Sequence, residues 1–194
     1  MNEEKFRNLK ELFPKTDESQ ILQVSEAIES LLEMLGEDKS REGLEDTPYR
    51  FLKAFAEYGE GYQEDPKMHL MKQFEAESQD MIVVKDIPFE SLCEHHLARF
   101  HGRVHIAYIP LEKIAGLSKF SRLVNGYSRR LQVQERLTKQ VADAIFEVLK
   151  PEACAVIIEA EHACMTARGT KARGSFTQTY ATRGADRDLL TYLK

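Results

Sequence analysis

A thiol and two imidazoles lie within residues 93–96, and a later segment adds a second thiol and a third imidazole at Cys164 and His162. Imidazole and thiolate are the preferred protein ligands of zinc. The C-x2-H spacing lets one short turn place the sulfur of Cys93 and a nitrogen of His96 on one ion. We therefore expect a catalytic zinc held by Cys93, His96 and Cys164, with a fourth position open to water.

Two histidines, His95 and His162, remain beside these ligands and are candidates for acid and base in proton transfer. A structural zinc site would instead close with four protein ligands, here Cys93, His96 (or His95), His162 and Cys164. Structural sites are often built from two C-x2-C knuckles, and this sequence contains none. The surplus histidine favours catalysis, while the closed site remains an alternative.

Basic residues near the metal fragments indicate an anionic ligand. Lys119 and Arg122 lie three positions apart near the start of an expected helix, with Ser118 at its first position. A helix start suits phosphate, because it presents free N–H groups and a positive dipole end. Arg168 follows Cys164 by four residues. Each of these residues alone could be an ordinary surface residue, so the hypothesis depends on their proximity to the metal fragments.

Gln134 and Glu135 stand at the start of the next expected helix. The amide offers a paired donor and acceptor and the carboxylate offers two acceptor oxygens, a combination that could read the amide and amino edge of a guanine. Alternatively, Glu135 does no more than favour the positive end of its helix. The third cysteine, Cys154, lies in an apolar run and is expected to be a small core residue.

Hydrophobic periodicity predicts the order helix, helix, strand, strand, helix, helix, strand, strand, which is an α+β fold with an antiparallel sheet and helices on one side. The helices are expected over 18–36, 47–58, 118–130 and 134–149, and the strands over 81–84, 99–109, 153–160 and 175–182. Residues 93–96 then lie in the connection between two strands. Residues 1–17 are weakly patterned, and 59–77 are expected to form a loop or linker with at most one short helical turn.

The chain of 194 residues is long enough for one substantial domain, or a domain with a small helical extension, and 42% hydrophobic with 30% charged residues is typical of a soluble globular protein. A net charge of -5 argues against nucleic acid as a partner. No signal peptide and no apolar run of membrane-spanning length is found, so no membrane partner is expected. Two of three cysteines stand beside histidines, which favours a reducing compartment, the cytoplasm.

Taken together, these motifs resemble the GTP cyclohydrolase I family over about residues 20–184. The matching stretches are Thr47-Pro48-Tyr49-Arg50, Cys93-Glu94-His95-His96, Gly116-Leu117-Ser118-Lys119, residues 127–138, His162-Ala163-Cys164 and Ala167-Arg168-Gly169. The resemblance implies a tunnelling-fold catalytic domain over 76–194, preceded by a helical region over 1–75. It also implies a toroidal homodecamer made of two pentameric rings, with active sites between subunits.

The resemblance further implies a role for each candidate residue. Its zinc ligands fall on Cys93, His96 and Cys164, and its acid and base histidines fall on His95 and His162. Its guanine-reading carboxylate falls on Glu135, beside Gln134. Its triphosphate contacts fall on Arg50, Lys119, Arg122 and Arg168, with Ser118 nearby.

The implied reaction converts GTP and water to 7,8-dihydroneopterin triphosphate and formate, the first step of tetrahydrofolate and pterin biosynthesis. Zinc would lower the pKa of its bound water to about 7, so that hydroxide adds to C8 of guanine at neutral pH. A zinc deaminase is one competitor, but its P-C-x-x-C segment does not occur in this sequence. A cysteine-dependent tunnelling-fold enzyme acting on a nitrile, and a structural zinc protein without turnover, are the others.

Overall fold

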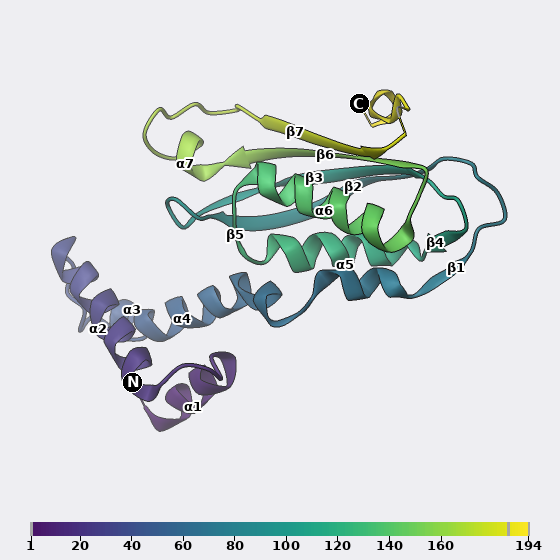
Figure 1. Cartoon of the computed structure of the whole chain (residues 1–194). Helices are drawn as coiled ribbons and strands as arrows, with labels where there is room; N and C mark the ends of the chain where they lie inside the picture. Colours follow the sequence, from purple (N-terminus) through teal and green to yellow (C-terminus); the bar gives the residue numbers. More distant parts are fainter. Residues whose placement is uncertain (1, 186, 194) are drawn as a thin grey trace. The chain divides into compact units, whose positions relative to one another are not determined.

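The computed structural model describes residues 2–185 and 187–193. The helices are α1 Glu3–Leu12, α2 Glu18–Met34, α3 Glu42–Glu45, α4 Thr47–Tyr58, α5 Leu117–Ser128, α6 Gln134–Leu149 and α7 Ala163–Thr166, with 3₁₀ helices η1 Glu60–Gln63, η2 Pro66–Met71 and η3 Leu189–Tyr192 (Figure 1). The strands are β1 Gln73–Glu75, β2 Ile82–Cys93, β3 Ala98–Ile109, β4 Lys113–Ala115, β5 Leu131–Gln132, β6 Ala153–His162 and β7 Thr177–Gly184. The chain forms two compact units, Met1–Gly59 and Glu60–Lys194.

The first unit is helical, as predicted, and has its own small core of Leu9, Ile21, Ile28 and Leu52. Residues 1–17 are only weakly patterned in sequence, and the structure adds helix α1 there. The Asn2 side chain accepts a hydrogen bond from the backbone N–H of Lys5 at 3.0 Å, which caps a helix whose buried contact is Leu9. Phe6, Leu9 and Leu12 recur at three-residue spacing, but a stripe of only ten residues is a weak sequence signal for a helix.

The second unit is built on a five-stranded sheet in the order β5-β2-β3-β6-β7. Its four long strands pair antiparallel, which confirms the predicted α+β arrangement. Two-residue β5 adds a parallel edge beside Leu92 and Cys93 at the end of β2, so the sheet is mixed. Strands β1 and β4 form a separate antiparallel pair within residues 73–115, where a loop was predicted up to residue 77.

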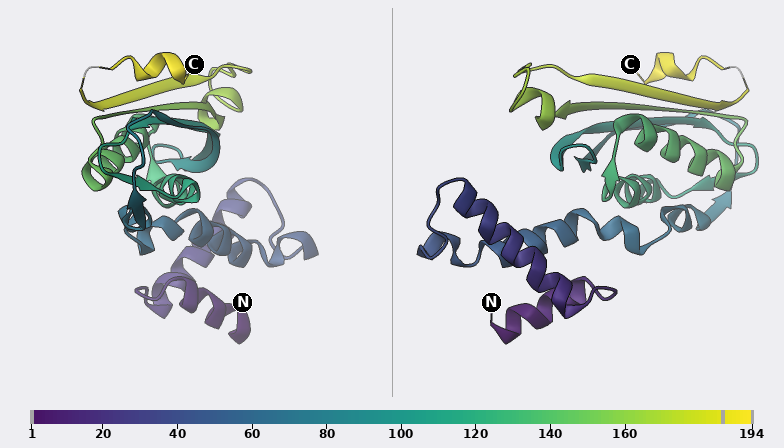
Figure 2. Two further views of the ribbon diagram at one scale, coloured as in Figure 1. Left: turned by 90° about the vertical axis from the view of Figure 1, so that its right-hand side faces the viewer. Right: turned by 60° about the vertical axis from the view of Figure 1, so that its left-hand side comes forward.

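Helices α5 and α6 lie together on one side of the sheet, as predicted (Figures 1 and 2). The alternation of residues 99–109 places Phe100, Val104, Ile106 and Tyr108 in the core beneath these helices, each fully buried. Burying an aliphatic or phenyl side chain of this kind contributes roughly 1.5–3 kcal/mol. The other face is partly covered by the C-terminal segment, where Leu189 packs in a second buried cluster.

Strand β2 is longer than the predicted 81–84. Its register shifts between Val84 and Ile87, where Asp86 takes a left-handed backbone conformation with φ 60°. At this bulge the backbone N–H of Asp86 does not pair with the backbone of the neighbouring strand. It donates instead to Nδ1 of His105 at 3.2 Å, so the N–H is still hydrogen-bonded. The bulge disrupts the alternation but not the strand, and β2 therefore continues to Cys93.

Candidate metal centre and active site

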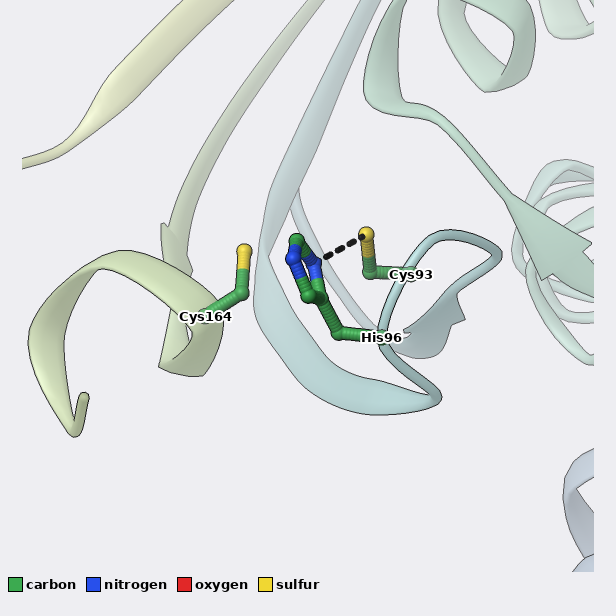
Figure 3. A group of neighbouring side chains, drawn as sticks. All are labelled: Cys93, His96 and Cys164. Carbon is green, nitrogen blue, oxygen red and sulfur yellow. Dashed lines mark hydrogen bonds between the residues drawn. The ribbon is translucent and has the colours of Figure 1, made fainter. Parts of the chain in front are cut away.

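Cys93, His96 and Cys164 converge at one end of the sheet (Figure 3). One ligand atom from each lies within 4.8 Å of the other two, and Cys93 Sγ is 3.9 Å from His96 Nδ1. In a tetrahedral site, Zn–S bonds near 2.3 Å and Zn–N bonds near 2.0 Å put neighbouring donors about 3.5–4 Å apart. The three side chains therefore need only small movements to share one ion.

Sheet register explains why segments so distant in sequence meet here. Cys93 pairs with Ala98 at the closed end of the β2–β3 hairpin, and Phe100 pairs with His162 at the end of β6. The hairpin turn and the start of α7 therefore lie at the same end of the sheet. Within the turn, Leu97 has φ 51° and donates its N–H to the Cys93 carbonyl at 2.9 Å, which directs the chain back into β3.

The donor set suits a soft divalent cation. Burial, together with the neighbouring Cys93 thiol, raises the pKa of the Cys164 thiol. A bound divalent cation reverses this preference, because a coordinating thiol is deprotonated outright. Within residues 2–185 and 187–193, no fourth histidine, cysteine or carboxylate joins this group. Three candidate ligands match the catalytic count rather than the four of a closed structural site.

His162 is held on two sides. Its ring stacks on Phe100 with ring centroids 4.7 Å apart and an interplanar angle of 5°. Its Nε2 lies 2.7 Å from Oε1 of Gln134. Burial lowers the pKa of His162, while the negative charge of Glu135 opposes this shift. A half-buried neutral imidazole next to a metal site is suited to accept a proton.

His95 is near the same site, but its side chain is much more exposed than that of His162. Its side chain is 64% exposed, and its Nδ1 lies 3.8 Å from Cys93 Sγ. Its ring meets the His96 ring edge to face, with centroids 6.2 Å apart. Each of the two predicted proton-transfer histidines thus adjoins a ligand segment, but only His162 has a buried partner fixing it.

An ion pair that the sequence analysis did not predict joins the β2–β3 turn to α6. Arg136 donates two hydrogen bonds to the Glu94 carboxylate, at 2.6 and 2.9 Å. Its guanidinium lowers the pKa of Glu94, and the carboxylate raises the pKa of Arg136 in turn. The Glu94 N–H also donates to the Gln132 carbonyl at 3.0 Å. No local pattern signals this pair, because it depends on where α6 begins relative to the hairpin.

The two predicted guanine readers lie differently. Gln134 is 1% exposed, and its side-chain amide is directed into the sheet. Glu135 is exposed in the first turn of α6. The helical angle of about 100° per residue separates the two neighbours onto different faces.

The predicted phosphate residues are not all brought to the metal end of the sheet. Ser118 and Lys119 stand at the start of α5, next to β4, whereas the end of α5 leads into β5 beside Cys93 (Figure 1). A helix of 12 residues spans about 18 Å. Arg122, one turn further along, lines a surface hollow of about 360 Å³ with Glu60 and His69 among its other walls.

The two remaining predicted anion contacts are both exposed arginines. Arg168 follows α7 and is close enough to Cys164 to lower the pKa of that thiol slightly against the larger opposing effects. Arg50 belongs to the helical unit, where its guanidinium donates to the Gly43 carbonyl at 2.7 Å and to Thr47 Oγ1 at 3.0 Å. Among the predicted basic residues that the structure describes in the second unit, only Arg168 lies beside a candidate metal ligand.

Cys154 is the core residue that was expected. It is fully buried in β6, and burial raises the pKa of its thiol to about 12. None of the helices that the structure describes is both long enough and apolar enough to cross a membrane.

Comparison with known proteins gives a consistent result. The family model described as GTP cyclohydrolase I matches residues 24–189. A GTP cyclohydrolase 1 of Geobacillus kaustophilus is 52% identical over 163 residues, covering 84% of this chain and 87% of the relative. One of Carboxydothermus hydrogenoformans is 52% identical over 159 residues, covering 81% and 83%. A solved structure of the apo archaeosine synthase QueF-Like covers 57% of this chain and 100% of its own, with TM-score 0.48 and 18% identity, a likeness too weak to bear on function.

Proposed function

Since the chain belongs to the GTP cyclohydrolase I family, we propose that it converts GTP and water to 7,8-dihydroneopterin triphosphate and formate. The observation that carries the proposal is the group of Cys93, His96 and Cys164, whose ligand atoms lie within 4.8 Å of one another and in which Cys164 follows His162, the N-cap residue of α7. A closed structural site would need a fourth protein ligand, and none of the described residues supplies one.

We propose zinc as the metal, held by the Cys93 and Cys164 sulfurs and a ring nitrogen of His96. Two thiolates and one imidazole are a donor set that zinc binds in catalytic sites. Bound there, zinc supplies Lewis acidity and lowers the pKa of water to about 7.

The chain's own residues then perform proton transfer and positioning. His162, half-buried and stacked on Phe100, accepts a proton as the imidazole ring of guanine is attacked at C8 and returns it as that ring opens. His95, exposed beside Cys93, is placed to act as its partner in acid–base exchange. Glu135, exposed at the start of α6, offers its carboxylate to the amide and amino groups of guanine.

The triphosphate is assigned to Ser118, Lys119, Arg122, Arg168 and Arg50. Ser118 and Lys119 start α5 about one helix length from the end that adjoins Cys93, so a complete site needs basic residues from a second copy. This placement supports a homo-oligomer with active sites between subunits, which we propose is a toroidal decamer. Residues 76–194 form the catalytic domain in this proposal, and 1–75 the preceding helical region.

The proposed compartment is the cytoplasm, because the site needs Cys93 and Cys164 as free thiols and a reducing environment preserves them.

The direct test is incubation of the purified protein with GTP. We expect formate and, after oxidation, a fluorescent pterin, with about one zinc per chain by metal analysis. A matched control is the Cys93→Ser protein, which lacks one ligand and should yield neither product. Zinc-loaded wild-type protein that releases no formate would contradict the proposal.

A further inference from the structure

The side-chain amide of Gln134 has every hydrogen committed inside the protein. Its Nε2 lies 2.9 Å from the carbonyl oxygen of Ile158, 2.9 Å from that of Thr177 and 3.0 Å from Thr179 Oγ1. Its Oε1 lies 2.7 Å from Nε2 of His162. The side chain is 1% exposed, so water does not compete for these contacts.

Two of these partners fix which way the amide faces. The backbone oxygens of Ile158 and Thr177 can only accept hydrogen bonds, so the atom facing them must be the NH₂ group. Rotating the amide by 180° would set its oxygen against both carbonyl oxygens and leave those two buried acceptors without the N–H groups that they now face. The amide oxygen of Gln134 therefore faces His162.

The hydroxyl partners close the same network. Thr138 Oγ1 donates its one hydrogen to the backbone carbonyl of Gln134 at 2.8 Å, so in its 2.7 Å contact with Thr179 it is the acceptor. The Thr179 hydroxyl then donates to Thr138 and, with the Ile158 and Thr177 carbonyls, shares the two hydrogens of Gln134 Nε2. The amide of Gln134 consequently has no N–H left to donate to guanine.

These hydrogen bonds decide which ring nitrogen of His162 carries a hydrogen. The oxygen of an amide only accepts, so the 2.7 Å contact requires a hydrogen on His162 Nε2. In the neutral ring, Nδ1 is then the nitrogen with the free lone pair. Stacking on Phe100 fixes the ring plane, so the direction of that lone pair is fixed as well.

We propose that Gln134 is a positioning residue for His162, holding its ring as the Nε2–H tautomer so that Nδ1 is the atom that exchanges the proton, and that Gln134 does not itself read guanine. This inference rests on the proposed function. It gives two adjacent residues of α6 different roles. Gln134 acts on the reaction by holding His162, and Glu135 binds the substrate.

The first test compares Gln134→Met with Thr179→Val in the zinc-loaded, full-length protein. Methionine keeps the length of the side chain but gives His162 no acceptor, so we expect kcat to fall about 10- to 100-fold with KM and zinc content within twofold. Thr179→Val disturbs the same network but leaves the two carbonyls that orient the amide, so kcat should change less than threefold. Equal losses in both variants would mean that Gln134 has only a structural role and would overturn the proposal.

A double-mutant cycle distinguishes two roles for Gln134, positioning of the His162 ring and direct binding of guanine. In a His162→Ala background, measured by single turnover, Gln134→Met should change the rate less than about twofold, because its effect passes through the missing ring. A raised KM for GTP that persists without His162 would assign Gln134 to guanine instead and overturn the proposal.

A measurement on the unaltered enzyme keeps the inference testable if the Gln134→Met and Thr179→Val variants fail to fold. In ¹⁵N-histidine-labelled, zinc-loaded protein near pH 8, the His162 signals are identified by their loss in His162→Ala. We expect a protonated, pyrrole-type Nε2 and an unprotonated, pyridine-type Nδ1; the opposite pattern overturns the proposal. Because this readout needs no turnover, a wild-type protein without GTP cyclohydrolase activity would contradict the proposed function while leaving the tautomer result separately readable.

Discussion

The two segments that carry the candidate metal ligands differ in how firmly their side chains are held. At the end of β6, His162 is half-buried, stacked on Phe100 and hydrogen-bonded to Gln134. In the β2–β3 turn, His95 and His96 are both exposed, and the turn is tied down mainly through its backbone and one ion pair. The β6 side of the site is therefore preorganised by the sheet, whereas the turn side is open.

This difference has a physical consequence for assembly of the site. An exposed imidazole keeps most of its rotamer freedom, and fixing such a side chain costs entropy. Metal binding must supply that ordering for His96, while the position of His162 is set by packing before any ligand binds. The open turn is also the side that substrate or a second copy can reach.

The largest expected effect tests whether the two segments act on one metal. Cys164→Ser should lose bound zinc and reduce formate release by more than about 100-fold, since loss of outer contacts alone weakens metal sites 10- to 100-fold. Zinc per chain and formate release are measured together. A Cys154→Ser control removes a buried thiol outside the ligand group and should retain zinc. Retention of one zinc per chain in Cys164→Ser would mean that the segments do not share an ion.

The next effect compares the two histidines directly. His162→Ala should keep zinc but lower kcat by roughly 10²- to 10⁴-fold, the usual contribution of a general acid or base. It should also lower the free energy of unfolding by about 1–3 kcal/mol, because Gln134 Oε1 is left buried without a donor. His95→Ala should lower kcat without lowering the thermal midpoint. Equal loss of stability in both variants would contradict the contrast between a fixed and a free histidine.

A smaller effect is expected from loosening the turn. Arg136→Met removes the ion pair to Glu94 and should weaken zinc binding roughly 10-fold, as loss of contacts around a metal site commonly does. Competition with a metal chelator measures the change. Arg103→Met is the matched control, because its ion pair with Asp86 lies on the same hairpin away from the turn. Unchanged zinc affinity in Arg136→Met would show that the turn needs no such tie.

The smallest effect concerns pH. Burial lowers the pKa of His162 below its ordinary value of 6.5, so the unfolded chain binds a proton there more readily than the folded chain does. The stability associated with the neutral ring is fully present above the unfolded pKa and is lost as pH falls through it toward the folded pKa. In metal-free protein, the free energy of unfolding of wild type should therefore fall relative to His162→Ala between pH 7.5 and pH 5. Parallel curves would contradict this.

Local pattern was sufficient for several features of this protein. The period-two alternation of residues 99–109 placed Phe100 and Tyr108 on the core face, because side chains of a strand point to opposite sides whatever their partners. Residue chemistry and spacing also predicted the candidate group of Cys93, His96 and Cys164, whose ligand atoms lie within 4.8 Å of one another. The alternation and the spacing of Cys93 and His96 depend on neighbours within a few positions, and the sequence by itself determines them. The approach of Cys164 to this pair depends on the register of the sheet.

Other features depend on register between distant segments, which only the tertiary structure decided. The bulge at Asp86 carries β2 on to Cys93, and the pairing of Phe100 with His162 stacks their rings. Gln134 meets His162 because α6 is packed over the end of β6. Lys119 lies near the start of α5, whereas it is the other end of this helix that leads into β5 beside Cys93. Long-range packing fixes these relations, since no local preference records which strand or helix a side chain will face.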